Sequence, residues 1–432
     1  MISKSNIILF SFLLFCGSLV AQKINRCASH TKLLEAMAQD ESLRLKIEQS
    51  KQTTSAIYSG QRTESTYPII TIPVVVHVLY KTAQQNINDA QIRSQIDVLN
   101  RDFNARNADS LPINHEFYNL IGNASIEFCL ASVKPGGSST TGIERKQVTY
   151  DGFEYSDADE SIIKSTSNGG LSAWNTSKYL NIWIVNFTDG TLGYATFPED
   201  NSGNKDGVVI AYDAFGTVGV LTPDYDKGRT STHEIGHWLG LYHIWGDDYN
   251  CTADDGIEDT PKQYEDSYGC PCEHPKVDNC SPSIMYQNFM DYTDDACMSL
   301  FTKDQVTRMR NVLSTASNRT SFLNNTVGCN THTPTSDNSV YCDVTLNNNI
   351  SINHDINIFP NPVRSTLFIE KLPPSISNYD IKIFNSIGAE VLSKQININQ
   401  TSLDVSSLNA GIYYLHISNH KIKMSTIVQV IK

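Results

Sequence analysis

The chain has 432 residues, of which 40% are hydrophobic and 18% are charged, and its formal net charge at pH 7 is -13. This length exceeds that of one typical domain, so we expect at least two hydrophobic cores. No block of lysines and arginines offsets the acidic excess. Binding to a nucleic-acid backbone is therefore not expected, because such binding requires clustered positive charge.

Residues 1–21 have the pattern of an export signal that is removed from the mature chain. An almost unbroken apolar run spans residues 7–20, and Ala21 supplies a small residue at the expected cleavage point. The run is shorter than the roughly 20 residues that cross a bilayer, so no retained transmembrane helix is expected. The bulky Phe15 before Cys16 argues against a lipid anchor at that cysteine.

Residues 22–61 form a polar segment that we interpret as a propeptide. Residues 33–49 are compatible with a helix, whereas residues 53–66 are rich in Ser and Thr and are typical of an exposed linker. Arg62 lies in this linker, just before the first core strand. We hypothesise that the precursor is cut beside Arg62. N-terminal sequencing of the secreted protein tests this, and a start outside residues 58–68 rejects it.

Residues 62–325 have the pattern of an α/β catalytic domain. Apolar runs predict strands at residues 72–80, 126–133, 179–187 and 207–212. Between the first two, residues 89–103 carry Ile92, Ile96 and Leu99 at helical spacing. Residues 192–198 could form an edge strand, along which an extended peptide would lie antiparallel through backbone hydrogen bonds.

The segment from His233 to His243 contains three histidines at the spacing of a catalytic zinc site. On a helix, His233 and His237 project from one face and can bind the same ion. Gly240 allows the chain to turn out of the helix and bring His243 to that ion. Three ligands leave one position for water, and Glu234 is placed to take a proton from that water. The alternative is an ordinary amphipathic helix whose histidines are solvated or buried in a core.

Two neighbouring features support the metal site. Thr230, Ser231 and Thr232 come just before it, and their hydroxyls could cap the start of its helix. Met290 follows it at the position of the Met-turn that accompanies the extended motif HExxHxxGxxH in metzincins. There, Met290 would form an apolar floor beneath the metal, and Tyr292 could supply a phenol as a switching ligand or an oxyanion donor.

The zinc segment and residues 288–298 together resemble the pappalysin family of metzincins, in particular its bacterial ulilysin and mirolysin type. The resemblance covers roughly residues 25–325. It implies a metzincin-type α/β fold, with a mixed twisted sheet, an active-site helix and a helical lower subdomain. It also implies a secreted zinc endopeptidase that is made as a zymogen and cleaves protein or peptide substrates. The alternative is a surface-binding protein with a structural or vestigial metal site, but only three histidines are present and the general base is retained.

Further roles are implied by the same resemblance. Cys27 would be the zymogen switch, with its thiolate in the open zinc position, although Ala28 follows it where relatives commonly have glycine. The alternative is that Cys27 forms a disulfide with another cysteine. In arginine-preferring relatives an acid near the Met-turn lines the S1′ pocket. Asp294 and Asp295 are the candidates here, although Ala296 stands directly before the next cysteine.

The chain contains ten cysteines, and in an exported protein these predict disulfide bonds. The resemblance favours a bond between Cys251 and Cys280, and a second between Cys297 and either Cys270 or Cys272. The alternative for this cluster is a structural zinc site, because closely spaced cysteines also bind metal.

Residues 247–261 form an acidic loop that could bind calcium, with Asp255 and Thr260 as candidate ligands. Calcium prefers oxygen ligands, and relatives of the ulilysin type carry structural calcium near this point. The spacing is not that of an EF-hand, and a solvated acidic loop is the alternative.

Beyond residue 325 the composition changes to Asn, Ser and Thr, which predicts a linker at residues 326–350. Cys329 and Cys342 are close enough in sequence to close a small loop there. Short alternating segments then predict a small β-sandwich over residues 351–432. This region resembles the C-terminal sorting domain of the type IX secretion system, which implies that this machinery is a partner and that the protein is secreted or attached to the cell surface. A carbohydrate-binding or adhesive sandwich is the alternative.

Overall fold

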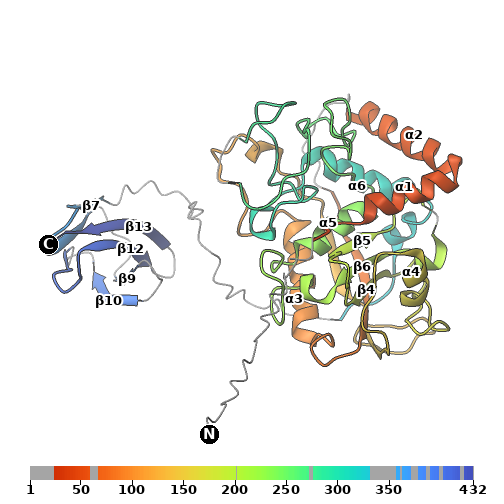
Figure 1. Cartoon of the computed structure of the whole chain (residues 1–432), viewed down its shortest axis with the longest axis horizontal. Coiled ribbons are helices and arrows are strands. Elements are labelled where there is room, and N and C mark those ends of the chain that lie inside the picture. The colour runs from red at the N-terminus through yellow and green to blue at the C-terminus, as the bar shows by residue number, and fades with distance from the viewer. Residues whose placement is uncertain are drawn as a thin grey trace, which may run out of the picture. The chain divides into compact units, whose positions relative to one another are not determined.

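The structure is a computed structural model that describes most of the N-terminal three quarters of the chain and the strands of its C-terminal region. The described residues are 24–58, 67–200, 202–271, 276–330, 357–360, 362–370, 378–385, 390–397, 402–418 and 423–431. The predicted export signal, Arg62, Cys272 and Cys342 lie outside these ranges. The chain divides into two compact units, Met1–Asp337 and Asn338–Lys432 (Figure 1). Each unit has its own hydrophobic core.

The first unit is built on a six-stranded sheet with the order β2-β1-β4-β6-β5, in which β3 also pairs with β1. Its strands are β1 (Ile70–Tyr80), β2 (Ile126–Leu130), β3 (Ile143–Gln147), β4 (Leu180–Val185), β5 (Gly193–Ala195) and β6 (Val208–Ala211). All neighbours pair in parallel except β5, which pairs antiparallel with β6 and lies at an edge. The long apolar runs of β1 and β4 are typical of parallel strands that are covered on both faces.

The described part of the first unit contains six α-helices. They are α1 (Ser29–Gln39), α2 (Glu41–Tyr58), α3 (Asp89–Asp102), α4 (Asp157–Ile163), α5 (Arg229–Trp238) and α6 (Lys303–Thr315). Short 3-10 helices occupy Tyr118–Leu120, Gly203–Lys205, Tyr212–Ala214, Asp295–Cys297 and Thr320–Asn324. Helix α5 contacts α3, β5 and β6, so the zinc motif on α5 lies next to the edge strand (Figure 1). None of the described helices is long and apolar enough to cross a membrane.

Helix α5 begins differently from the prediction. Its N-cap is Gly228, with a positive φ of 75° and no side-chain cap. Instead, the Asp295 carboxylate accepts the backbone N–H of Arg229 at 3.0 Å. The prediction of capping by Thr230, Ser231 and Thr232 is wrong, because these residues lie inside the first turn rather than before it. Thr232 donates its hydroxyl to Asp102 instead, at 2.6 Å.

The N-terminal segment is more helical than predicted. Helix α2 continues to Tyr58, so residues 53–58 belong to a helix and not to the linker that their composition predicts. Ser and Thr lower helix stability by only a few tenths of a kcal/mol each, which is too little to end a helix that has already formed.

A disulfide bond joins Cys129 in β2 to Cys329, with a Cα–Cα distance of 5.6 Å. The predicted small loop between Cys329 and Cys342 is therefore wrong. The chain after α6 returns across the end of β2, where Ser132 N–H donates to the Gly328 carbonyl at 2.8 Å and residue 329 forms a bridge with Ala131. Residues 326–330, at the start of the predicted linker, thus belong to the first unit and pack against β2.

The second unit contains two antiparallel sheets, one of four strands in the order β10-β9-β12-β13 and one of three in the order β11-β8-β7. Its strands are β7 (Asn357–Phe359), β8 (Thr366–Glu370), β9 (Asn378–Phe384), β10 (Glu390–Asn397), β11 (Ser402–Asp404), β12 (Gly411–Ser418) and β13 (Lys423–Val430). Leu367 and Leu403 of one sheet share a core with Ile381, Leu415 and Val428 of the other. This is the small β-sandwich that the sequence predicts.

Candidate metal centre

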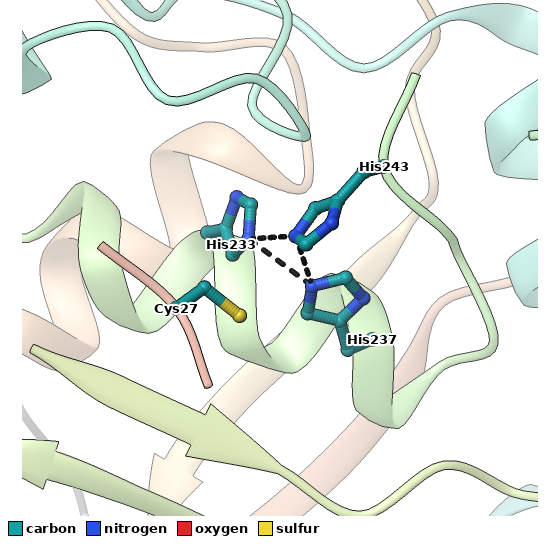
Figure 2. Close-up of side chains that lie close together, drawn as sticks. All are labelled: Cys27, His233, His237 and His243. Atoms are coloured by element: carbon teal, nitrogen blue, oxygen red, sulfur yellow. Dashed lines mark hydrogen bonds between the residues drawn. The ribbon is translucent and has the colours of Figure 1, made fainter. Parts of the chain in front are cut away.

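Three imidazoles converge at the end of α5. The Nε2 atoms of His233, His237 and His243 lie 3.0 to 3.2 Å from one another, and all three side chains are buried (Figure 2). His233 and His237 come from one face of α5. Gly240, with a positive φ of 86°, turns the chain so that His243 reaches the same point.

The second nitrogen of each ring is held by an acceptor. His233 Nδ1 donates to the Phe289 carbonyl at 2.7 Å, and His237 Nδ1 donates to the Leu241 carbonyl at 2.8 Å. His243 Nδ1 donates to Asp247 Oδ1 at 2.5 Å. With Nδ1 protonated, the three Nε2 atoms face one another as acceptors, an arrangement that is unfavourable unless a cation lies between them.

The pKa values of the histidines also favour a metal ion between the three imidazoles. Burial, followed by the neighbouring imidazoles, lowers the pKa of His233 and of His237 well below the usual range. Both rings are therefore neutral at physiological pH, and neutral imidazole is the form that binds a metal. The donor set of three imidazoles fits zinc, which binds such nitrogens in catalytic sites.

A fourth group points at the histidines from the N-terminal segment. The Cys27 thiol and the three imidazoles offer ligand atoms that all lie within 4.8 Å of one another (Figure 2). Cys27 is buried and is the free cysteine of the described residues, so it is not a disulfide partner there. Within the described residues, Cys27 and the three histidines form a group of three or more His, Cys, Asp or Glu side chains that could hold one metal ion.

Glu234 lies next to the histidines and contacts the N-terminal segment. Its Oε2 atom accepts the Ser29 hydroxyl at 2.6 Å and the Cys27 thiol at 3.5 Å. Its Oε1 atom is buried without a hydrogen-bond partner. Burial raises the pKa of Glu234 to about 7, although the hydrogen bonds from Ser29 and Cys27 act in the opposite direction. A carboxyl group with such a pKa can accept and return a proton near neutral pH.

Met290 lies directly beneath α5. A Cβ atom placed on Gly236 would lie only 2.5 Å from Met290 Sδ, so the absence of a side chain at Gly236 permits this close approach. Tyr292 packs its ring 4.8 Å from that of His243, and its hydroxyl donates to the Cys27 carbonyl at 3.3 Å. Burial raises the pKa of Tyr292 well above its usual range, so its phenol remains a proton donor.

Comparisons with known proteins agree with this geometry. Residues 166–314 match the peptidase M43 family model, which is described as pregnancy-associated plasma protein-A. An extracellular metalloprotease of Arthroderma otae is 30% identical over 246 residues, covering 56% of this chain and 76% of that protein. The chain belongs to the pappalysin family of metallopeptidases.

The solved structures that are similar to this pappalysin include mature and precursor forms of mirolysin. Mature mirolysin of Tannerella forsythia in complex with a cleaved peptide is 50% identical, with a TM-score of 0.56, and covers 60% of this chain and 96% of that one. A variant of Tannerella forsythia promirolysin is 45% identical, with a TM-score of 0.61, and covers 69% of this chain and 96% of that one. The α/β fold expected from the sequence is confirmed.

The C-terminal sandwich has a separate match. Residues 357–432 match the model of a secretion system C-terminal sorting domain. This pappalysin is therefore an exported protein, secreted or held at the cell surface.

The N-terminal segment of the pappalysin also places an arginine beside the metal centre. Arg26 donates to Asp295 Oδ1 at 2.8 Å, and both side chains are fully buried. The guanidinium carbon of Arg26 lies 4.7 Å from the centroid of the Tyr225 ring. The other oxygen of Asp295 accepts the backbone N–H groups of Lys227 and Arg229, each at 3.0 Å. Of the two predicted acids it is Asp295, and not the half-buried Asp294, that receives the guanidinium.

Several residues of the site were not predicted from the sequence. Asp247, assigned there to the calcium loop, instead accepts from His243 on one oxygen and lies 2.9 Å from His30 Nδ1 on the other. Ser29 contacts Glu234, and Arg26 contacts Asp295. The spacing of four residues between His243 and Asp247 could have indicated their contact, but the other pairs lie more than 200 residues apart in sequence.

The acidic loop does not bring together a group of three acidic side chains within the described residues. Asp255 is buried, and its Oδ1 atom accepts the Thr260 hydroxyl at 2.8 Å. Its Oδ2 atom is buried without a hydrogen-bond partner. Burial raises the pKa of Asp255 to about 8. The carboxylate therefore lacks compensation for a negative charge, which a bound cation would supply.

Two disulfide bonds hold the segment between α5 and the Met-turn. Cys251 pairs with Cys280, and Cys270 pairs with Cys297. These are pairings implied by the family resemblance, with Cys270 rather than Cys272 as the partner of Cys297. The second bond ends at Cys297, which lies between Asp295 and Met298, and both of these residues contact Arg26.

Proposed function

We propose that this protein is a secreted zinc-dependent endopeptidase that is made as an inactive zymogen. The observation that carries the proposal is the convergence of three imidazole acceptors beside a buried carboxyl group, with Cys27 directed at the same point. His233, His237 and His243 would hold the zinc. When bound, zinc lowers the pKa of a water ligand and polarises a substrate carbonyl.

Glu234 and Tyr292 are the groups of this chain that we assign to the chemistry. Glu234 takes a proton from the attacking water and returns it to the amine that leaves, which its pKa of about 7 allows in both directions. Tyr292 already donates a hydrogen bond to a carbonyl, that of Cys27. In the active enzyme its phenol would donate in the same way to the oxygen of the scissile carbonyl, where negative charge develops.

We attribute latency to the path of residues 25–29 of the proposed pro-segment (residues 22–61), which follow β5 beside the metal centre. Asn25 forms a parallel bridge with Thr191, and Ala28 N–H donates to the Gly193 carbonyl at 3.0 Å. A substrate would lie antiparallel to β5, so the pro-segment runs along β5 in the opposite direction and does not present a bond for cleavage. The Ala195 N–H group, which a substrate could use, is held by the Ser29 hydroxyl at 2.8 Å.

Cys27 adds a direct block at the metal. Burial and the neighbouring Glu234 carboxylate raise the pKa of the Cys27 thiol well above its usual range. These protein groups alone favour the protonated thiol. A zinc ion within bonding distance would favour the thiolate and so bind the sulfur in the position that water needs.

We further propose that the enzyme prefers arginine, or another basic residue, directly after the scissile bond. The ion pair between Arg26 and Asp295 supports this. Arg26 follows Asn25, which pairs with Thr191 just before β5 begins, and the residues after the scissile bond of an antiparallel substrate would lie toward this start of β5. Asp295 is held in place by backbone N–H groups at the start of α5, so it remains a ready acceptor when the pro-segment leaves.

Calcium is proposed as a structural ion in the acidic loop, with Asp255 as a ligand and Thr260 beside it. The uncompensated Oδ2 atom of Asp255 supports this assignment.

For export, we propose that the signal at residues 1–21 directs the chain across the inner membrane and that residues 351–432 engage the type IX secretion machinery. Residues 62–325 would form the catalytic domain and residues 326–350 the linker.

The experiment that tests the proposal is cleavage of a peptide library by the processed protein, with and without a metal chelator. We expect cleavage before arginine, complete loss of cleavage after chelation, and recovery when zinc is added back. A processed and folded protein that cleaves no peptide, or cleaves equally after chelation, would contradict the proposal. Cleavage without preference for a basic residue would remove only the assignment of Asp295.

A further inference from the structure

A second basic side chain of the pro-segment is bound on the catalytic domain, away from the metal centre. Lys32 Nζ, on α1, lies 2.7 Å from Glu160 Oε2, on α4, and the two side chains are 14% and 4% exposed. The same ammonium lies 5.3 Å from the centroid of the Tyr194 ring, on β5. A carboxylate oxygen combined with an aromatic ring is an arrangement that binds lysine and arginine side chains.

This binding place lies on one defined side of the cleft. Asn25 pairs with Thr191, before β5 begins, whereas Ser29 contacts Ala195, where β5 ends. Lys32 follows Ser29 by one helical turn. Because a substrate runs antiparallel to β5 in the proposed function, its residues before the scissile bond lie toward the end of β5. The side chain of Lys32 therefore lies on the side that binds the residues preceding the scissile bond.

Removal of the pro-segment would take Lys32 away from one oxygen of the Glu160 carboxylate, Oε2. Glu160 Oε1 is held by Lys164 Nζ at 2.8 Å, and that ammonium also donates to the Lys205 carbonyl at 2.6 Å. Besides Lys32, the half-exposed Lys205 lies at Oε2, with its Nζ at 3.7 Å. The pair with Lys164, whose Nζ also lies 5.3 Å from the centroid of the Tyr194 ring, thus fixes the carboxylate. Its second oxygen then becomes available for another cation beside that ring.

We propose that Glu160 and Tyr194 form a second specificity site of the mature enzyme, which binds a lysine or arginine side chain on the N-terminal side of the scissile bond. The site rests on the proposed endopeptidase function, and it is separate from the arginine pocket at Asp295. In the zymogen, Lys32 occupies this site and Arg26 is bound to Asp295. The pro-segment thereby fills both sites that would bind basic side chains of a substrate.

The test compares peptides that all carry arginine after the scissile bond and differ only in lysine or norleucine at one of the three preceding positions. For the processed wild-type enzyme we expect kcat/KM to be about 10-fold higher with lysine at one of these positions, the effect of one hydrogen bond between charged groups. In Glu160→Gln the ratio of the two kcat/KM values should fall to about 1. Asp157→Asn, which changes an exposed carboxylate on the same helix, is the matched control and should keep the wild-type ratio.

Because Glu160→Gln leaves Lys164 buried without a carboxylate, the double variant Glu160→Gln/Lys164→Met is measured as well and should also give a ratio of about 1. A wild-type ratio near 1 at all three positions overturns the proposal, and so does a lysine preference that persists in either variant. Failure of the wild-type enzyme to cleave any of the peptides would instead count against the proposed function itself.

Discussion

Glu234 is the residue on which the proposed chemistry depends most. Glu234→Ala should slow peptide hydrolysis by about 10²- to 10⁴-fold, the usual contribution of a general base. The variant should still bind zinc, because the three imidazoles and the acceptors of their Nδ1 atoms are unchanged. Turnover and metal content of the same processed preparation check this, and near-normal turnover would refute the assignment.

In the proposed zymogen, Cys27 and Ser29 should make separate contributions to latency. In the unprocessed chain, Cys27→Ala removes the group directed at the metal, and Ser29→Ala removes the hydroxyl between Glu234 and Ala195. Each loses an interaction with a charged group worth about 1.5–3 kcal/mol, so each variant should hydrolyse peptides at least about 10-fold faster than the unprocessed wild type.

The measurement is the initial rate before any processing is visible on a gel. Ser42→Ala, at an exposed position of the same segment, is the control and should not change the rate. If Cys27→Ala leaves the rate unchanged, the thiol has no role in latency. The direction of the pro-segment along β5, opposite to that of a substrate, would then be sufficient to block activity.

Sequence alone could predict the residues whose partners are local. His233, His237 and His243 lie within eleven residues, so helix geometry and one glycine turn define their meeting point. The ion pair of Arg26 with Asp295 spans 269 positions, and nothing in the spacing of either residue indicates it. Such contacts depend on how the pro-segment lies on the catalytic domain, which is a property of the folded chain.

Among the secondary-structure elements, those with strong apolar patterns were predicted and those with polar sequences were not. The strands β1, β4 and β6 are nearly continuous apolar runs and were found close to their true bounds. Strand β3 contains Glu144, Arg145 and Lys146, and only its pairing with β1 makes it a strand. Helix α6 could have been predicted from the capping box of Thr302 and Gln305.

The disulfide between Cys129 and Cys329 joins the chain that follows the proposed catalytic domain to β2. Replacing both cysteines with serine should lower the free energy of unfolding by about 2–4 kcal/mol. Chemical denaturation followed by circular dichroism measures this. The matched control replaces Cys251 and Cys280, whose bond closes a much shorter loop of 29 residues and should contribute less. An unchanged midpoint without the first bond would contradict its structural role.

The acidic loop should respond to calcium in a pH-dependent way. Burial raises the pKa of Asp255 to about 8 in the metal-free protein, whereas the unfolded value is about 3.9. The folded state thus holds an extra proton between these values, so its stability falls as the pH rises from about 4 to about 8. Calcium, which favours the ionised form, should raise the Tm more at pH 8 than at pH 5. Asp255→Asn should abolish this difference, and an equal response in that variant would exclude Asp255 as a ligand.

At the scale of the whole molecule, composition was sufficient to separate a catalytic unit from a C-terminal sandwich. The change to Asn, Ser and Thr after residue 325 marks the transition, and alternating segments mark the strands that follow. Composition could not show that residues 326–330 contact β2, because that contact depends on Cys129, 200 positions earlier. In the proposed function, the sorting domain and the pro-segment belong to a peptidase that would be exported in a blocked form and become active after processing.

The zinc content of the purified, processed protein tests the central claim most directly. Elemental analysis should find one zinc ion per chain in the wild type and in Glu234→Ala, and far less in His237→Ala, which lacks one of the three imidazoles. Wild-type protein that holds no zinc after purification and does not take it up on dialysis would contradict the account.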